Sequence, residues 1–292
     1  MASDDKDRLT SSERDTAGME GISAMSRAIS RRELIRRTGP GMAAALGMRV
    51  PTLAFEPNAM PGFANRLVGK RVQAAAVNFP AAARWFRNPE VTGIPVRPEF
   101  FAIGPPSAGP PHLLVFGGSQ GARVFNQTLP GIVRALLDAV PGLTILHQSG
   151  ARHAEWTQAA YAESGADSSR WRVEPFLNDM PARFAQAHLV MARSGASTVA
   201  ELAAAGKPAL LVPFAAAADD HQTRNAEVMV NAGAAAMLGE ADLASPTKLF
   251  TALSGLLAAP QTLAMMSMAA RTQAHPHAAE RIADRLAELA VG

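Results

Sequence analysis

From residue 112 onward, short apolar runs alternate with longer segments of mixed polarity. Apolar runs bounded by glycine, proline and polar residues predict buried strands at 112–116, 143–148, 171–176, 189–193, 208–214 and 235–238. The segments between them predict helices from about 121, with a break near Pro130, and at 154–164, 178–187, 198–205, 221–232 and 245–258. Strands that alternate with helices of this length indicate an α/β fold, in which helices cover both faces of a parallel sheet.

The elements before residue 112 are shorter. Residues 52–55 and 74–77 predict buried strands, and residues 61–71 predict a helix that Pro61 opens. The stretch from Gly104 to Pro111 is rich in proline and glycine, so we expect a linker and a domain boundary there.

The start of the chain is different again. Residues 1–30 are polar, charged and aperiodic, which is the composition of a disordered tail. Ser30-Arg31-Arg32 precedes a short apolar patch and is similar to a twin-arginine export signal. Because the patch is short and Arg49 follows it, a basic helix leading into an Ala-rich helix from Gly41 to Gly47 is the plainer interpretation.

Composition narrows the class of protein. The 292 residues suggest about two domains, and 48% apolar residues are enough for hydrophobic cores. The chain has no cysteine, which excludes disulfides and thiolate metal sites and fits a cytoplasmic protein. No run of about 18 consecutive apolar residues occurs, so we expect no membrane-spanning segment.

The net charge of +3 is unevenly distributed. Residues 25–100 hold twelve Lys/Arg against four Asp/Glu, which favours anionic partners such as phosphates or an anionic membrane surface. Aromatic residues make up only 5% of the chain, and we see no stacking platform for single-stranded nucleic acid. We therefore expect no nucleic-acid partner.

Three loops that follow predicted strands have unusual compositions. In open parallel sheets, ligands bind at the carboxyl ends of the strands. The first loop, GGSQGA at 117–122, ends a buried strand on glycines, which let backbone N–H groups approach a phosphate at the start of a helix. A tight strand-to-helix turn without a ligand explains the same residues, so this loop alone leaves both interpretations open.

The second loop is RSGASTVAE at 193–201. Gly195 and Ala196 leave the backbone open, and Ser197 or Thr198 is expected to begin a helix whose N–H groups can hold a phosphate oxygen. Glu201 lies one turn further, where a carboxylate can accept both hydroxyls of a ribose. The alternative is a capping box from Thr198 to Glu201, which needs no ligand.

The third loop is AAAADDHQTRNA at 215–226. Asp219 or Asp220 is expected to cap the next helix, which places His221 and Gln222 in its first turn. Imidazole and amide groups suit sugar hydroxyls, which both donate and accept hydrogen bonds. The Asp-Asp-His cluster also raises a metal site, but no further ligands have fitting spacing, so we expect no metal and no cofactor.

Taken in order, these segments resemble a known family. GGSQGARVFNQTLP, VEPFLNDMP, RSGASTVAELAAAGKPALLVPF and DDHQTRNAEVMVNAGAA look like the C-terminal half of MurG proteins. PTLAFEPNAMPGFANRL and VTGIPVRPEF resemble parts of the N-terminal half, so the resemblance runs from about Thr38 to Gly292. Members of this family transfer GlcNAc from UDP-GlcNAc to undecaprenyl-pyrophosphoryl-MurNAc-pentapeptide in peptidoglycan synthesis.

The resemblance implies a GT-B fold, with two Rossmann-like domains and UDP-GlcNAc in the cleft between them. It divides the chain into an unrelated or disordered tail at 1–37, a remnant of the acceptor domain at 38–104, and a UDP-GlcNAc-binding domain at 105–292. It also implies a lipid-linked acceptor and a peripheral position on the cytoplasmic face of the plasma membrane.

The resemblance also assigns the nucleotide contacts. Ser119 is expected to contact the diphosphate, and the backbone of Ala196–Thr198 is expected to hold the same group. Glu201 is expected to bind the ribose, and the Phe176–Leu177 turn is expected to seat the uracil.

The remaining assignments concern the sugar and the leaving group. His221 and Gln222 are expected to meet the GlcNAc hydroxyls, Asn58 the donor sugar, and Arg97 the phosphates, where a guanidinium suits developing charge. The full implied set is Asn58, Arg97, Ser119, Phe176, Leu177, Ala196, Ser197, Thr198, Val199, Ala200, Glu201, His221 and Gln222.

The chain departs from the family pattern in its first part. Family members begin with a strand and a Gly-Gly-Thr-Gly-Gly-His loop, which has no counterpart here, and the second Gly-rich loop survives only as TGPG at 38–41. The missing histidine is the proposed base, so we name no catalytic residue and expect poor transfer by the chain as written. Glu56 is expected to support the loop that carries Asn58.

Three functions remain open from the sequence. The first is a MurG-type glycosyltransferase. The second is a remnant that binds a UDP-sugar without catalysis. The third is another GT-B protein, such as a UDP-GlcNAc 2-epimerase, which needs acid/base carboxylates and histidines that the sequence does not place in the cleft.

Overall fold

The structure is a computed structural model that describes residues 48, 50–105 and 109–291. The chain divides into two compact units, Met1–Val50 and Pro51–Gly292, and every helix and strand below lies in the second. Several sequence-based predictions lie outside the described residues. They are the tail at 1–37, the export motif at 30–32, the TGPG segment at 38–41 and the Ala-rich helix from Gly41 to Gly47.

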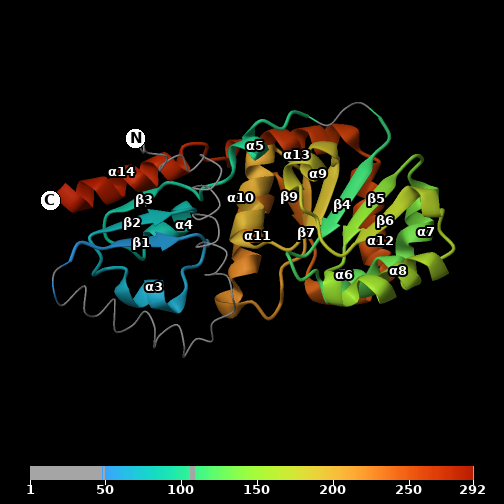
Figure 1. The fold of residues 1–292 in the computed structure, drawn as a ribbon, viewed down its shortest axis with the longest axis horizontal. Helices are drawn as coiled ribbons and strands as arrows, with labels where there is room; N and C mark the ends of the chain where they lie inside the picture. The colour runs from blue at the N-terminus through green and yellow to red at the C-terminus, as the bar shows by residue number, and fades with distance from the viewer. Residues whose placement is uncertain (1–47, 49, 106–108, 292) are drawn as a thin grey trace, which may run out of the picture. The chain divides into compact units, whose positions relative to one another are not determined.

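The larger sheet of the second unit has six parallel strands (Figure 1). They are β4 His112–Phe116, β5 Thr144–Gln148, β6 Trp171–Glu174, β7 Leu189–Ala192, β8 Ala209–Leu211 and β9 Ala235–Met237. Each strand lies within its predicted range, which confirms the predicted parallel sheet. The order is β6-β5-β4-β7-β8-β9, so the chain runs outward from β4 to β6 and then returns to β7 beside β4.

The helices predicted between residues 121 and 258 are formed, whereas two further helices, at 260–272 and 278–291, were not predicted. The predicted break at Pro130 separates the first two, because proline favours the first turn of a new helix. The helices are α6 Arg123–Thr128, α7 Pro130–Ala139, α8 Ala154–Glu163, α9 Met180–Gln186, α10 Ala196–Ala205, α11 His221–Asn231, α12 Pro246–Leu257, α13 Pro260–Thr272 and α14 Ala278–Val291. In the part of the chain that the structure describes, four short 3₁₀ helices lie at Ala151–His153, Ser168–Arg170, Ala218–Asp220 and Glu240–Ala244.

A smaller parallel sheet precedes this one, in the order β1-β2-β3. Its strands are β1 Leu53–Glu56, β2 Ala74–Val77 and β3 Pro89–Val91, and its helices are α3 Phe63–Val68, α4 Pro80–Ala83 and α5 Pro98–Phe101. The helix expected at 61–71 is therefore shorter than predicted. The last helix, α14, returns to this sheet, where Arg281 Nε lies 2.9 Å from Glu90 Oε1.

Successive residues of the central strand β4 point to opposite faces of the sheet and pack in two different hydrophobic cores. Leu113 and Val115 pack with α7, α8 and α12, whereas Leu114 and Phe116 pack with α9, α10 and α11. Both faces of the larger sheet are thus buried, as parallel sheets require. The second of these cores also contains Phe79 and Phe100 from the first part of the unit.

Among the described residues, no single helix is long and apolar enough to cross a membrane. Helices α12 and α13 pass that test only as a pair, and they are bent by 86° at the break between them.

Candidate functional site

The strand order defines one special position in the larger sheet. Strands β4 and β7 are neighbours, paired from Leu113↔Leu189 to Phe116↔Ala192, but the chain leaves them toward opposite edges. Ligands of open α/β folds bind at such a switch point, beyond the carboxyl ends of the strands. Two of the three predicted loops, 117–122 and 193–201, begin there.

The Gly-rich loop after β4 has a backbone that requires glycine. Gly118 and Gly121 have φ values of +90° and +70°, and a Cβ on Gly121 would lie 1.9 Å from the Ser149 carbonyl oxygen. The Gln148 amide donates a hydrogen bond of 3.1 Å to the Gly118 carbonyl. Ser119 lies exposed at the tip of this loop. The geometry of the turn therefore explains why glycine is needed at both positions, and these two glycines by themselves do not indicate a ligand.

The loop after β7 leads into α10, which begins at Ala196 with Gly195 as its N-cap. The predicted capping box from Thr198 to Glu201 is therefore wrong: the helix begins two residues earlier than predicted, and no side chain caps it. Ser197 is exposed, Ala196, Thr198 and Ala200 are half-buried, and Val199 is buried. Free backbone N–H groups of the first turn remain, as at any helix start.

Glu201 is half-buried, and it has no hydrogen-bond partner among the described residues. Burial raises the pKa of Glu201 to about 7, and the guanidinium of Arg97 opposes this rise. Arg97 is the exposed N-cap of α5, and its guanidinium lies 5.2 Å from the Phe100 ring centroid. The Arg97 guanidinium, 104 positions away in the chain, thus acts electrostatically on Glu201, whose carboxyl group accepts no hydrogen bond from the described residues.

The loop after β8 is held by an arginine that the sequence analysis did not single out. Arg193 donates to the carbonyls of Val212 and Pro213 at 3.2 and 2.9 Å, and it pairs with Glu240 at 2.9 Å. Glu240 also accepts the Ala215 N–H at 2.8 Å, and these contacts hold the pKa of Glu240 below its usual value despite partial burial. The loop that carries the third motif is therefore fixed at its first residues.

Helix α11 presents the residues expected at the sugar. Its N-cap, Asp220, is in the left-handed region with φ of 55° and makes no capping hydrogen bond, so the predicted Asp220 cap is not formed. Gln222 Oε1 accepts the Phe214 N–H at 3.0 Å, and its amide nitrogen has no partner within the described ranges. His221 Nδ1 donates to the Met60 carbonyl at 2.8 Å, which fixes the proton on that nitrogen.

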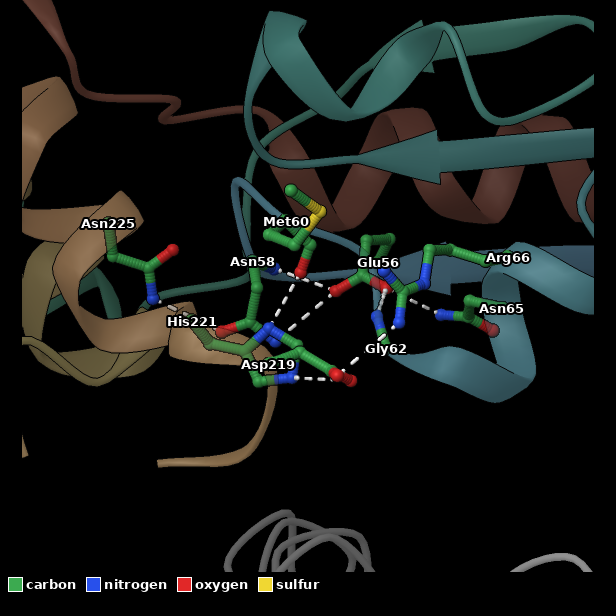
Figure 2. A network of polar contacts seen from close by, with 9 residues as sticks. All are labelled: Glu56, Asn58, Met60, Gly62, Asn65, Arg66, Asp219, His221 and Asn225. Atoms are coloured by element: carbon green, nitrogen blue, oxygen red, sulfur yellow. Dashed lines mark hydrogen bonds and ion pairs between the residues drawn. The ribbon is translucent and has the colours of Figure 1, made fainter. Parts of the chain in front are cut away.

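A buried polar network joins α11 to the loop after β1 (Figure 2). Glu56 is 1% exposed and accepts hydrogen bonds from the Asn58 backbone and amide, the Gly62 backbone and the Asn65 amide, at 2.9–3.2 Å. The expected support of the Asn58 loop by Glu56 is thus confirmed. On the other side, Arg66 lies 3.4 Å from Asp219, whose second oxygen lies 4.0 Å from His221 Nε2.

The predicted uracil contact divides between two residues. Phe176, after β6, is 50% exposed, whereas Leu177 is 5% exposed and belongs to the core. The side chain of Leu177 therefore packs in the core, and the uracil contact expected of this turn would come from the Phe176 ring and the Leu177 backbone. The structure brings Arg97 toward Glu201 and joins Asn58 to α11. It places Phe176 two strands away from β4.

No three histidine or carboxylate side chains gather as a metal site in the part of the chain that the structure describes.

The comparisons with known proteins agree with one another. A family model of the glycosyltransferase family 28 C-terminal domain matches residues 112–282. A Solibacter usitatus protein named UDP-N-acetylglucosamine--N-acetylmuramyl-(pentapeptide) pyrophosphoryl-undecaprenol N-acetylglucosamine transferase is 45% identical over 255 residues, which are 86% of this chain and 69% of that protein. The protein of the same name from Xanthomonas axonopodis pv. citri is 46% identical over 252 residues, 84% of this chain and 57% of that protein.

Solved structures are similar as well. The crystal structure of Acinetobacter baumannii MurG matches with a TM-score of 0.75 at 32% identity, over 86% of this chain and 70% of that chain. A UDP-GlcNAc 2-epimerase from Neisseria meningitidis matches with a TM-score of 0.58 at 13% identity, covering 84% of this chain and 72% of that one, which shows the fold alone. The chain spans between 57% and 69% of the length of the two named relatives.

Proposed function

The chain belongs to the MurG group of glycosyltransferase family 28, and from this membership we propose that it binds UDP-GlcNAc for transfer of GlcNAc to undecaprenyl-pyrophosphoryl-MurNAc-pentapeptide. The predicted family and GT-B fold are confirmed by these comparisons. The reaction is the one named for the longer relatives, so it is a proposal for this chain. The epimerase alternative has only a fold likeness in its favour.

One observation carries the proposal: the unpartnered carboxyl of Glu201 beside Arg97 at the switch point. A half-buried carboxyl group without hydrogen bonds is unfavourable unless a ligand supplies donors. The two hydroxyls of a ribose supply them, and the Arg97 guanidinium suits the phosphates that follow the ribose. A nucleoside diphosphate thus satisfies both groups at once.

The other nucleotide contacts follow from the same placement. The first-turn N–H groups at Ala196–Thr198 and exposed Ser119 in the Gly-rich loop offer donors to the diphosphate. The exposed ring of Phe176 and the backbone of Leu177 offer an edge for the uracil. Half-buried Ala200 lies on the helix surface between these groups, and Val199 packs in the core beneath it, so neither makes a polar contact.

We expect α11 and the loop after β1 to bind the sugar end of the donor. The side-chain amides of Asn58 and Gln222 each have hydrogen-bonding groups that their contacts within the protein do not use, and His221 is oriented by the bond from its Nδ1 to the Met60 carbonyl. Such groups match hydroxyls that both donate and accept. Arg97 can stabilise the charge that develops on the departing UDP. No described residue is assigned as the base.

We propose peripheral binding to an anionic membrane surface on the cytoplasmic side through the smaller sheet. Phe63 and Leu67, one turn apart on α3, are 52% and 60% exposed, and Phe55 of β1 is 39% exposed. Residues 51–100 hold six Lys/Arg against three Asp/Glu, which supports the electrostatic part of this contact.

Two assays test the proposed function. Calorimetric titration of the chain with UDP, UDP-GlcNAc and a thymidine diphosphate should show saturable binding of the two uridine ligands and weaker binding of the third. Absence of heat at millimolar UDP-GlcNAc would remove the proposal. A transfer assay with radiolabelled UDP-GlcNAc and a short-chain lipid I analogue then measures the activity of this chain directly.

A further inference from the structure

We propose that a cavity beside the smaller sheet is a second ligand site, which takes a small molecule of one ring that carries a hydroxyl group. The cavity has a volume of about 130 Å³. One wall comes from β3, the loops after β2 and β3, and α5, and the other comes from α10, α11 and the chain at the end of α13. The cavity thus lies at the carboxyl ends of β2 and β3, where parallel sheets bind ligands.

Most of the cavity wall is apolar, and its size selects the class of ligand. Its buried and half-buried apolar side chains include Phe79, Val91, Val96, Val199, Ala203 and Met229. An apolar cavity of roughly 150 Å³ binds benzene, whereas sites for larger ligands have volumes of roughly 300–1,000 Å³. The cavity therefore fits a single ring and is too small for UDP-GlcNAc.

Three polar side chains of the lining have hydrogen-bonding groups without a partner among the described residues. His275 makes no side-chain hydrogen bond within the described ranges. Asn78 donates from Nδ2 to the Pro57 carbonyl at 3.1 Å, and Gln273 donates from Nε2 to Thr272 Oγ1 at 3.1 Å, so the side-chain carbonyl oxygen of each remains available. A ligand with a polar group satisfies them better than a pure hydrocarbon does.

The position of His275 is fixed by the backbone of the loop after β3. Gly93 has a φ of +84°, and a Cβ on it would lie 2.2 Å from His275 Cβ, so this close packing requires glycine. Burial, and then the charge of Arg281, lower the pKa of His275, so its ring is neutral at pH 7. A neutral imidazole offers one donor and one acceptor, which match a hydroxyl group.

The cavity adjoins the proposed nucleotide site through two chain segments. Val96 lines the cavity and Arg97 follows it directly, while Val199 and Ala200 line the cavity and Glu201 follows them. A ligand that fills the cavity packs against both segments and restrains the distance between the groups proposed to hold UDP. Occupancy should therefore strengthen UDP binding, because a preorganised site loses less freedom on binding. This coupling rests on the proposed function, whereas the second site itself does not.

Titration of the full chain with phenol, followed by ligand-observed NMR, tests the second site. Phenol should bind saturably, and toluene, which lacks the hydroxyl, should bind more weakly by about threefold or more. Ala203→Leu adds an isopropyl group to the wall and should reduce phenol affinity by about tenfold or more. Ala264→Leu is the matched control: it makes the same change at an exposed position of α13 and should bind phenol like the wild type. His275→Leu should remove the preference for phenol over toluene.

Circular dichroism checks that each variant is folded. If Ala203→Leu does not fold, Val91→Leu enlarges a side chain on the opposite wall and should show the same loss of phenol binding. Absence of saturable phenol binding to the wild type, or equal phenol affinity in a folded wall variant, would overturn the second site. A preference for phenol that survives His275→Leu would overturn the assignment of the hydroxyl to His275.

Calorimetric titration of UDP with and without saturating phenol measures the coupling. UDP affinity should increase by about threefold or more, and UDP should increase phenol affinity by the same factor. Ala203→Leu should bind UDP with no response to phenol. Phenol binding that leaves UDP affinity unchanged would overturn the coupling. Phenol binding by a chain that binds no uridine ligand would support the second site and contradict the proposed function.

Discussion

Replacing Glu201 with glutamine removes the ionisable group at the proposed ribose position while keeping its size. Burial raises the pKa of Glu201 to about 7, so the carboxyl is mostly protonated at pH 6 and mostly ionised at pH 8. A carboxylate accepts both ribose hydroxyls, whereas a protonated carboxyl or an amide accepts them less well. Affinity for UDP should therefore rise by up to about tenfold between pH 6 and pH 8.

The assay is calorimetric titration of UDP at pH 6, 7 and 8 with the wild-type chain and with Glu201→Gln. UDP has its own phosphate titration in this range, but both proteins experience it, so the ratio of their affinities isolates Glu201. At pH 8 the wild type should bind more tightly by ~1–3 kcal/mol, the scale of a hydrogen bond to a charged group. A ratio that does not change with pH would refute this account of Glu201.

The stability of the folded chain should respond to Glu201→Gln in the opposite direction to UDP affinity. The folded pKa of Glu201 is about 7 against an unfolded value near 4.5, so ionisation disfavours the folded state increasingly as pH rises from about 4.5 to 7. Glu201→Gln should therefore raise the free energy of unfolding at pH 8, by up to about 3 kcal/mol, while it weakens UDP binding. A variant that loses both stability and affinity would indicate that Glu201 supports the fold rather than a ligand.

Three further predictions concern other parts of the chain. Burial lowers the pKa of His147 to about 3, so the free energy of unfolding of the wild type should fall as the pH drops below about 6.5. In urea unfolding between pH 7 and pH 4.5, His147→Leu should lose about 3 kcal/mol less stability than the wild type. Equal losses of stability in the two proteins would contradict this prediction. Gly121→Ala should weaken UDP binding by about tenfold or more in titration, because its Cβ collides with a backbone carbonyl, whereas Gly131→Ala, with open space, should bind normally. Sedimentation with anionic vesicles should decrease with salt and with a Phe63→Ser, Leu67→Ser double variant; equal binding to neutral vesicles would count against the electrostatic contact.

The strands of the larger sheet could be predicted because parallel strands are buried on both faces. Such strands appear as continuous apolar runs, as in Leu113–Phe116. Strand β3, Pro89–Val91, was not predicted, since it is short, begins with proline and buries none of its three residues. The strand order could not be predicted either, because neighbouring strands pair through backbone groups that are the same in every residue.

Site residues could be predicted where they lie in loops that directly follow strands. They could not be predicted where the site depends on contacts between segments that are distant in the sequence. Ser119, Glu201 and Gln222 follow strands in loops of distinctive composition. Asn225 of α11, whose side chain bonds to the loop after β1, was missed because an asparagine inside a predicted helix usually marks a solvent-exposed position. Its partners at Ala59 and Asn58 lie 166 and 167 residues away, so only the folded chain reveals the contact.

The central claim is that the loops at the carboxyl ends of β4, β6 and β7 form a uridine diphosphate site. Hydrogen exchange of the chain with and without saturating UDP, followed by mass spectrometry, tests it most directly. The account predicts slower exchange at 117–122, 176–177 and 195–201. It predicts unchanged exchange in α7 and α8, which pack against the face of the sheet opposite α9, α10 and α11. Slowing confined to segments away from these three loops, or no slowing at a UDP concentration that produces binding heat, would contradict it.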